Sequence, residues 1–149
     1  MPSFDEIVNE LQGKINDEII DAFGPAGFER WRNPPHRGKP AKANYEGVST
    51  GGCGDTIRIF LYIEDDKVCD AGFATDGCGS SMISGSMAAE LAIGKPCDDL
   101  DTITGETVLE GLGGDKGLPA DDQHCAWLAA TALHEAVGDY YKQTVKCKK

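Results

Sequence analysis

The chain has 149 residues, a length that suits one domain with a substantial core and is short for two. Its formal net charge of −11 argues against binding to nucleic acid or to an anionic membrane surface, because a polyanion requires a basic face. No apolar run approaches the roughly 20 residues of a membrane span, and the acidic start MPSFDEIVNE lacks the positive charge of a signal peptide. We therefore interpret residues 1–149 as one cytoplasmic domain with no nucleic-acid and no membrane partner.

Residues 1–24 are predicted to form an N-terminal helix. Ser3 and Glu6 have the spacing of a capping box, and apolar residues recur at helical intervals that suit packing. Gly24 and Pro25 are expected to end this helix. Residues 25–54 follow as a segment rich in proline, glycine and basic residues, which suits either a solvated loop or an interaction surface.

Residues 55–76 are predicted to form a β-hairpin. The run DTIRIFLYI alternates apolar and other residues, EDDK supplies a turn, and VCDAGFAT returns as the second strand. The stretch ANYEGVST before it indicates a third strand.

Helices are predicted for most of the remaining chain. One begins near Ser80 and ends at the sequence GKP, a short one lies around TGETVLEGL, and a long one closes the chain with Asp121 or Asp122 as its N-cap. We therefore predict an α+β fold, in which a small antiparallel β-sheet of about three strands packs against helices, one of them a long C-terminal helix.

The six cysteines show no CxxC pair. Without a secretory signal, a disulfide framework is disfavoured, because thiols in the cytoplasm are kept reduced. Zinc ribbons and fingers, whose ligands come in close pairs, are disfavoured as well. Any metal site must therefore be assembled from single cysteines that lie far apart in the sequence.

Three cysteines occupy positions that favour reactive or metal-binding thiols. Cys78 lies between glycines just before a predicted helix, and Cys125 lies in the first turn of the last one. Backbone N–H groups and the helix dipole favour the thiolate at such places. Cys53 follows two glycines, which allow close approach of the backbone. This pattern predicts a metal or cluster site, and Asp55 or His124 could supply a fourth ligand.

The other thiols and histidines favour plainer interpretations. Cys69 falls inside a predicted strand, Cys97 follows a helix end, and Cys147 lies in a basic tail, so we expect none of them to be a ligand. His134 is interpreted as structural or surface, and His36 in the basic segment is left unassigned.

The motifs CGDT, DGCGSS and HCAWLA, in this order, resemble the iron–sulfur cluster assembly scaffold family typified by IscU and the N-terminal domain of NifU. NPPHRG is similar to an N-terminal segment of that family, and the resemblance runs from Trp31 to Tyr141. It implies an α+β fold and a scaffold or carrier, not an enzyme. Its members assemble a transient [2Fe–2S] cluster from iron and desulfurase-derived sulfur and pass the cluster to acceptor proteins.

The resemblance also implies roles for individual residues. Cys53, Cys78 and Cys125 match the cluster-ligating, sulfur-accepting cysteines, Asp55 matches an aspartate associated with a labile cluster, and His124 matches a histidine beside the last cysteine. The implied partners are a cysteine desulfurase, an iron donor and apo iron–sulfur acceptor proteins.

The segment before the last motif departs from one branch of the family. Where that branch has LPPVK, the docking motif of a dedicated chaperone, this chain has LPADDQ. A lysine's positive charge is replaced by negative charge, which disfavours recognition by that chaperone.

Two alternatives keep the cysteines and change the cargo. A zinc-dependent sulfur acceptor, or sulfurtransferase, of the SufU type would bind Zn²⁺ through Cys53, Asp55, Cys78 and Cys125. That branch typically has an insertion before the third cysteine and lacks a histidine beside it, whereas His124 is present here. A purely structural zinc module is disfavoured because the glycine-flanked cysteines are expected to be exposed. A cluster scaffold could still carry Zn²⁺ when purified, because zinc competes well for thiolate sites.

Overall fold

The computed structural model describes residues 3–51, 54–77, 79–113, 118 and 122–147. Three antiparallel strands form one sheet in the order β1-β2-β3, with β1 at Tyr45–Thr50, β2 at Thr56–Glu64 and β3 at Lys67–Thr75. Asp65 and Asp66 both have positive φ in the tight turn between β2 and β3, as a two-residue hairpin turn requires. The predicted α+β fold with a small antiparallel sheet is confirmed.

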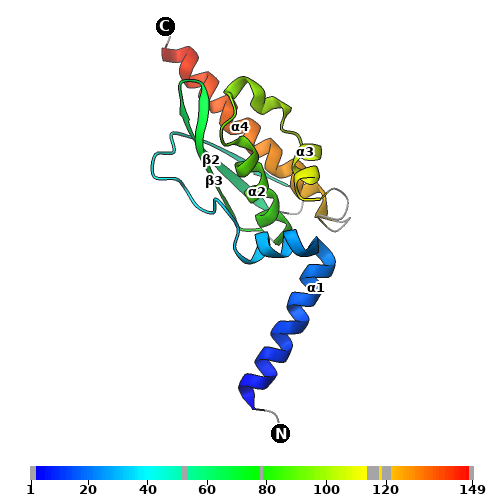
Figure 1. Ribbon diagram of the computed structural model, residues 1–149. Coiled ribbons are helices and arrows are strands. Elements are labelled where there is room, and N and C mark those ends of the chain that lie inside the picture. The colour runs from blue at the N-terminus through cyan, green and yellow to red at the C-terminus, as the bar shows by residue number, and fades with distance from the viewer. Residues whose placement is uncertain (1–2, 52–53, 78, 114–117, 119–121, 148–149) are drawn as a thin grey trace.

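The helices cover one face of the sheet (Figure 1). Helix α2 (Gly79–Ala92) lies against β3, and the long helix α4 (His124–Cys147) lies against β1 and β2. A 3₁₀ helix, Cys97–Thr102, and helix α3 (Gly105–Gly111) connect them. Alternate residues of β2 point into the core between these layers and are almost fully buried, namely Ile57, Ile59, Leu61 and Ile63.

The opposite face of the sheet is covered in part by the segment before β1. At Gly72 this segment lies so close that a Cβ atom would be 2.0 Å from the Gly38 carbonyl oxygen. Lys39 lies over the ring of Phe60 and Lys42 over the ring of Tyr62, with ammonium-to-centroid distances of 5.8 and 5.9 Å. Part of the basic segment therefore packs against the sheet and is not simply a solvated loop.

Helix α1 spans Phe4–Arg32, so the prediction that it ends at Gly24 and Pro25 is wrong. A proline inside a helix removes one N–H donor and bends the axis, but flanking turns can continue. Figure 1 shows this bend, after which the last turns of α1 run beneath α2. There the Arg30 guanidinium donates to the Ser86 hydroxyl at 2.9 Å and to the Glu90 carboxylate at 3.1 Å. The expected capping box of Ser3 and Glu6 is present.

The first turns of α1 do not pack against the core, contrary to expectation. Their apolar side chains stay exposed because the helix points away from the sheet before its bend (Figure 1). The exposed fraction is 79% for Phe4 and between 42% and 54% for Ile7, Val8, Leu11 and Ile15. Within the described residues, no helix is both long enough and apolar enough to cross a lipid bilayer.

The sheet and α4 come very close together at Gly47 in β1. A Cβ atom there would lie 2.2 Å from the backbone nitrogen of Ala136 and 2.3 Å from the backbone oxygen of Ala132, both in α4. The backbone of α4 therefore rests directly on β1, which only glycine permits.

We expect Gly47→Ala to lower the free energy of unfolding by about 3 kcal/mol, because α4 must move away from β1 to admit the methyl group. Gly13→Ala is the matched control, since a Cβ atom at Gly13 meets nothing within 4 Å and alanine is the better helix former. Urea unfolding of both variants checks this. Equal stabilities would contradict the close contact.

Candidate functional site

Asp55 is placed by the tight connection between β1 and β2. The Gly51 N–H donates to the Asp55 carbonyl oxygen at 2.9 Å, and the Gly54 N–H donates to the Gly51 carbonyl oxygen at 3.0 Å. Gly54 has a φ of +92°, which favours glycine. The connection thus holds the half-buried Asp55 immediately before β2, at one end of the sheet.

The buried Ser81 hydroxyl joins Asp55 to Cys125. It donates to Asp55 Oδ2 at 3.0 Å, and its oxygen lies 3.5 Å from Cys125 Sγ. Because the single hydroxyl hydrogen is used on the carboxylate, the serine oxygen can accept a hydrogen bond from the Cys125 thiol. A chain of contacts from thiol through hydroxyl to carboxylate therefore connects α4, α2 and the start of β2.

Gly77 makes room for this arrangement. A Cβ atom at Gly77 would lie 2.7 Å from Ser81 Oγ and 2.8 Å from the Asp55 carboxylate carbon. A larger residue would therefore push the hydroxyl and the carboxylate apart. Cys78 directly follows Gly77 in the sequence.

His124 and Cys125 occupy the first turn of α4, as predicted. Their side chains differ in accessibility, because His124 is exposed and Cys125 is 0% exposed. The thiol of Cys125 is buried because this turn packs against the start of α2 and faces Ser81. The imidazole Nε2 of His124 lies 3.8 Å from Cys125 Sγ, so it borders the thiol on the side of solvent.

A second serine, Ser80, ties the same two helix starts together. Its hydroxyl donates to Asp122 Oδ2 at 3.0 Å. Asp122 was predicted as a possible N-cap of α4, and it instead precedes the helix by two residues and binds α2. The alternative N-cap, Asp121, lies outside the described residues.

Cys53 and Cys78 also lie outside the described residues. Within the described part of the chain, no three His, Cys, Asp or Glu side chains gather closely enough to hold a metal ion. Of the five predicted site residues, the structure thus brings Asp55, His124 and Cys125 to one end of the sheet, and the roles of all five stay predictions.

The thiols outside the predicted site have contrasting surroundings. Cys69 is exposed on β3. Cys97 is 2% exposed, and burial raises the pKa of its thiol to about 11, with the Asp66 and Asp98 carboxylates adding to the shift. At neutral pH this thiol stays protonated, which makes it a poor nucleophile and a poor metal ligand. Cys147 ends α4.

The remaining histidines have structural surroundings in the described residues. The His134 ring Nε2 lies 2.7 Å from the Ile103 carbonyl oxygen, which fits its interpretation as structural. His36 has a φ of +67°, and its carbonyl oxygen accepts from the Phe73 N–H at 3.1 Å at the edge of the sheet.

Ser81 and Gly77 are site residues that the sequence did not identify. In the motif DGCGSS, only Cys78 was predicted to be a site residue. The signal that could have found them is composition, because α2 buries four serines, Ser80, Ser81, Ser84 and Ser86, on a helix packed against the core. A buried hydroxyl needs a partner, so such a helix predicts polar contacts inside the fold.

Comparison with known proteins shows the family of this chain. The family model of the NifU-like N terminal domain matches residues 23–147. The chain belongs to this family. The iron–sulfur cluster assembly scaffold protein IscU 1 of Archaeoglobus fulgidus is 38% identical over 125 residues, which cover 82% of this chain and 78% of the relative. The resemblance found in the sequence is therefore confirmed.

Two solved structures share the fold. A NifU-like N-terminal protein from Brucella abortus aligns with a TM-score of 0.67 at 16% identity, covering 84% of this chain and 98% of that one. A SufU-type scaffold protein from Fervidobacterium islandicum aligns with a TM-score of 0.58 at 19% identity, covering 77% of this chain and 96% of that one. At such identities the likeness supports the fold alone.

We expect Ser81→Ala to destabilise the fold by about 1 kcal/mol, because it removes the hydroxyl that Asp55 and Cys125 share. Ser84→Ala is the matched control. Ser84 is equally buried in α2, and its hydroxyl has no hydrogen-bond partner among the described residues, so its loss should be neutral or stabilising. Urea unfolding of the two variants measures the difference, and equal effects would contradict a bridging role for Ser81.

Proposed function

We propose that this chain is a cytoplasmic scaffold and carrier, without an enzymatic reaction of its own, formed as one domain by residues 1–149. A transient [2Fe–2S] cluster is assembled on it from iron and from sulfur that a cysteine desulfurase supplies. The cluster is then passed to apo iron–sulfur acceptor proteins. Cys53, Cys78 and Cys125 are the proposed thiolate ligands, and Asp55 or His124 completes the site.

The observation that carries the proposal is the contact chain from Cys125 through Ser81 to Asp55. It joins two proposed ligands that are 70 positions apart in the sequence, as expected if both face one cargo. Relatives named as iron–sulfur cluster assembly scaffolds, among them that of Archaeoglobus fulgidus, support the same function.

The combination of thiolate and carboxylate ligands suits a cluster that is transferred to another protein. Thiolates are the usual ligands of iron–sulfur clusters, and a ligand other than cysteine changes the charge and stability of the site. A carboxylate is a harder ligand than thiolate and can be protonated or displaced by an incoming group. In this protein the Asp55 carboxylate accepts a hydrogen bond from the neutral Ser81 hydroxyl, which orients it.

A zinc-dependent sulfur acceptor of the SufU type is the second candidate. The observation that favours it is the burial of Cys125, because closed sites of three thiolates and one carboxylate suit tetrahedral Zn²⁺. The exposed His124, which that branch lacks, favours the cluster scaffold. Iron, zinc and sulfide analysis of protein purified without oxygen distinguishes the two candidates.

We expect anaerobic addition of iron, supplied as Fe³⁺, with sulfide and a thiol reductant to give a red-brown species with the visible absorption of a [2Fe–2S] cluster. Single replacement of Cys53, Cys78 or Cys125 by Ser should weaken that absorption, because each removes one thiolate. The matched control combines Cys69→Ser and Cys147→Ser with Cys97→Ala, where alanine suits the buried position. Loss of the cluster in this triple variant would show that the cysteines have been assigned wrongly.

We expect Asp55→Ala to slow cluster release to an apo ferredoxin by about tenfold, which corresponds to about 1.4 kcal/mol in the barrier. The reason is the loss of an exchangeable oxygen ligand. Ser81→Ala is the matched control, because it removes the same hydrogen bond and keeps the carboxylate. Visible circular dichroism follows the transfer. Normal release from Asp55→Ala, with only a lower melting temperature, would mean that Asp55 merely holds the turn.

A further inference from the structure

The outer edge of β1 is open for strand pairing. The bond from the Gly51 N–H to the Asp55 carbonyl oxygen belongs to the hydrogen-bonded pairs of the β1–β2 ladder, and these recur at every second residue. The backbone groups of Glu46, Val48 and Thr50 therefore point away from β2. Among the described residues, these outward groups have no backbone hydrogen-bond partner.

The opposite edge of the sheet, at β3, is covered by other parts of the chain. Along β3, the Gly38 N–H donates to the Phe73 carbonyl oxygen at 2.7 Å, and the Val68 N–H donates to the Lys95 carbonyl oxygen at 3.0 Å. Two separate segments thus cover the outer side of β3. Since an uncovered edge is a template for pairing with another chain, the contrast singles out β1.

A groove runs between this open edge and the outer flank of α4. It has a volume of about 370 Å³. The groove lies where α4 rests directly on Gly47, with Glu135, Asp139 and Lys142 of α4 beside the strand. Its walls are formed by Glu46, Gly47, Val48, Glu135, Asp139 and Lys142.

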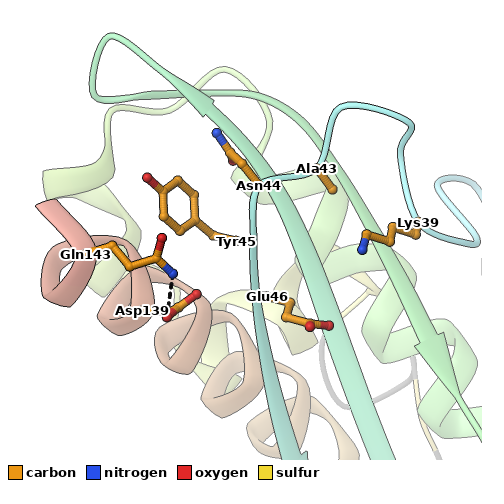
Figure 2. A pocket seen from close by; sticks show the side chains of 7 residues that line it. All are labelled: Lys39, Ala43, Asn44, Tyr45, Glu46, Asp139 and Gln143. Atoms are coloured by element: carbon orange, nitrogen blue, oxygen red, sulfur yellow. Dashed lines mark hydrogen bonds between the residues drawn. The ribbon is translucent and has the colours of Figure 1, made fainter.

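A second hollow, of about 210 Å³, continues the groove along β1. It shares Glu46 and Asp139 with the first and is also lined by Lys39, Tyr45 and Gln143. Figure 2 shows Tyr45 pointing toward α4 and Glu46 lying on the other side of the strand. The open edge is therefore flanked by side chains from both faces of the sheet, as an added strand requires.

The charges of the groove indicate the chemistry of its occupant. Three carboxylates, those of Glu46, Glu135 and Asp139, line the groove together with the Lys142 ammonium group, and the Lys39 ammonium group lines the adjoining hollow. The Glu46 carboxylate is also 3.0 Å from the exposed guanidinium of Arg58, and the Gln143 amide donates to Asp139. Two copies of this chain paired edge to edge would bring these carboxylates together, which disfavours a second copy and favours a basic segment.

We propose that the edge of β1 and the groove beside α4 bind an extended, basic segment of a partner protein as a fourth strand. Its backbone bonds to Glu46, Val48 and Thr50, and its alternate side chains are lysine or arginine facing Glu135 and Asp139. The intervening side chains are β-branched and pair with Val48, which is 44% exposed. This binding is separate from the proposed cluster site and holds whether or not that function is correct.

The probe is a short peptide of alternating lysine and valine, titrated into the ¹⁵N-labelled full chain. We expect shifted and protected amides at Glu46, Val48 and Thr50, and binding that weakens as salt is added. A peptide of alternating glutamate and valine is the control and should not bind. Shifts confined to other surfaces, binding of both peptides alike, or self-association of the chain through β1 would overturn the proposal.

Three variants locate the contact. Val48→Pro removes one outward N–H and keeps the ladder to β2, so it should abolish binding, whereas Val48→Thr keeps the N–H and should bind. Glu135→Gln with Asp139→Asn should weaken binding about tenfold and reduce its salt dependence. This double charge variant tests the proposal even if Val48→Pro disturbs the fold. Unchanged affinity in the charge variant would overturn the proposal.

Discussion

The contact of α4 with β1 at Gly47 determines where both surfaces of this molecule lie. Since the α4 backbone touches the strand there, the helix cannot slide or rotate without a clash or a gap. Cys125 lies 11 residues before Ala136, or about 16 Å along the helix axis, which carries it to the end of the sheet. In the other direction, Asp139 and Lys142 lie beside Glu46, Gly47 and Val48 of β1 and form part of the wall of the groove.

Buried serines then join the helix starts to the sheet. A buried hydroxyl without a partner is costly, so the pairing of Ser80 with Asp122 and of Ser81 with Asp55 fixes the relative positions of three chain segments. Apolar residues of the same size would fill the space without specifying which groups meet. Polar contacts thus give this end of the molecule its geometry, while the apolar side chains of β2 hold the layers together.

The elements with strong periodicity could be predicted from the sequence, and the long-range contacts could not. Alternation in DTIRIFLYI indicated β2 because one face of that strand is buried. The end of α1 was missed since this helix continues through Gly24 and Pro25, and local signals do not distinguish a bend from an end. The exposure of Phe4 and its neighbours was missed because periodicity reports an apolar face, not whether something covers it.

For the candidate site, the residue types and their likeness to a family could be predicted from the sequence, but the geometry could not. Asp55 and His124 were identified by their nearness to cysteines in the sequence. Ser81 and Gly77 act only through contacts between distant segments, which one sequence does not display. The burial of Cys125 likewise depends on which side of α4 faces α2, a consequence of packing.

The alternation of the β1–β2 ladder separates the two functions proposed for this chain. The residue pairs that hydrogen-bond between β1 and β2 end with Gly51 and Asp55. This last bond holds Asp55 where its carboxylate accepts from Ser81. The alternate residues of β1, Glu46, Val48 and Thr50, direct their backbone N–H and C=O groups away from β2. A strand added at the outer edge would therefore extend the sheet without breaking any bond that positions Asp55. A partner held along β1 and a cluster held at its end can accordingly occupy the protein at the same time.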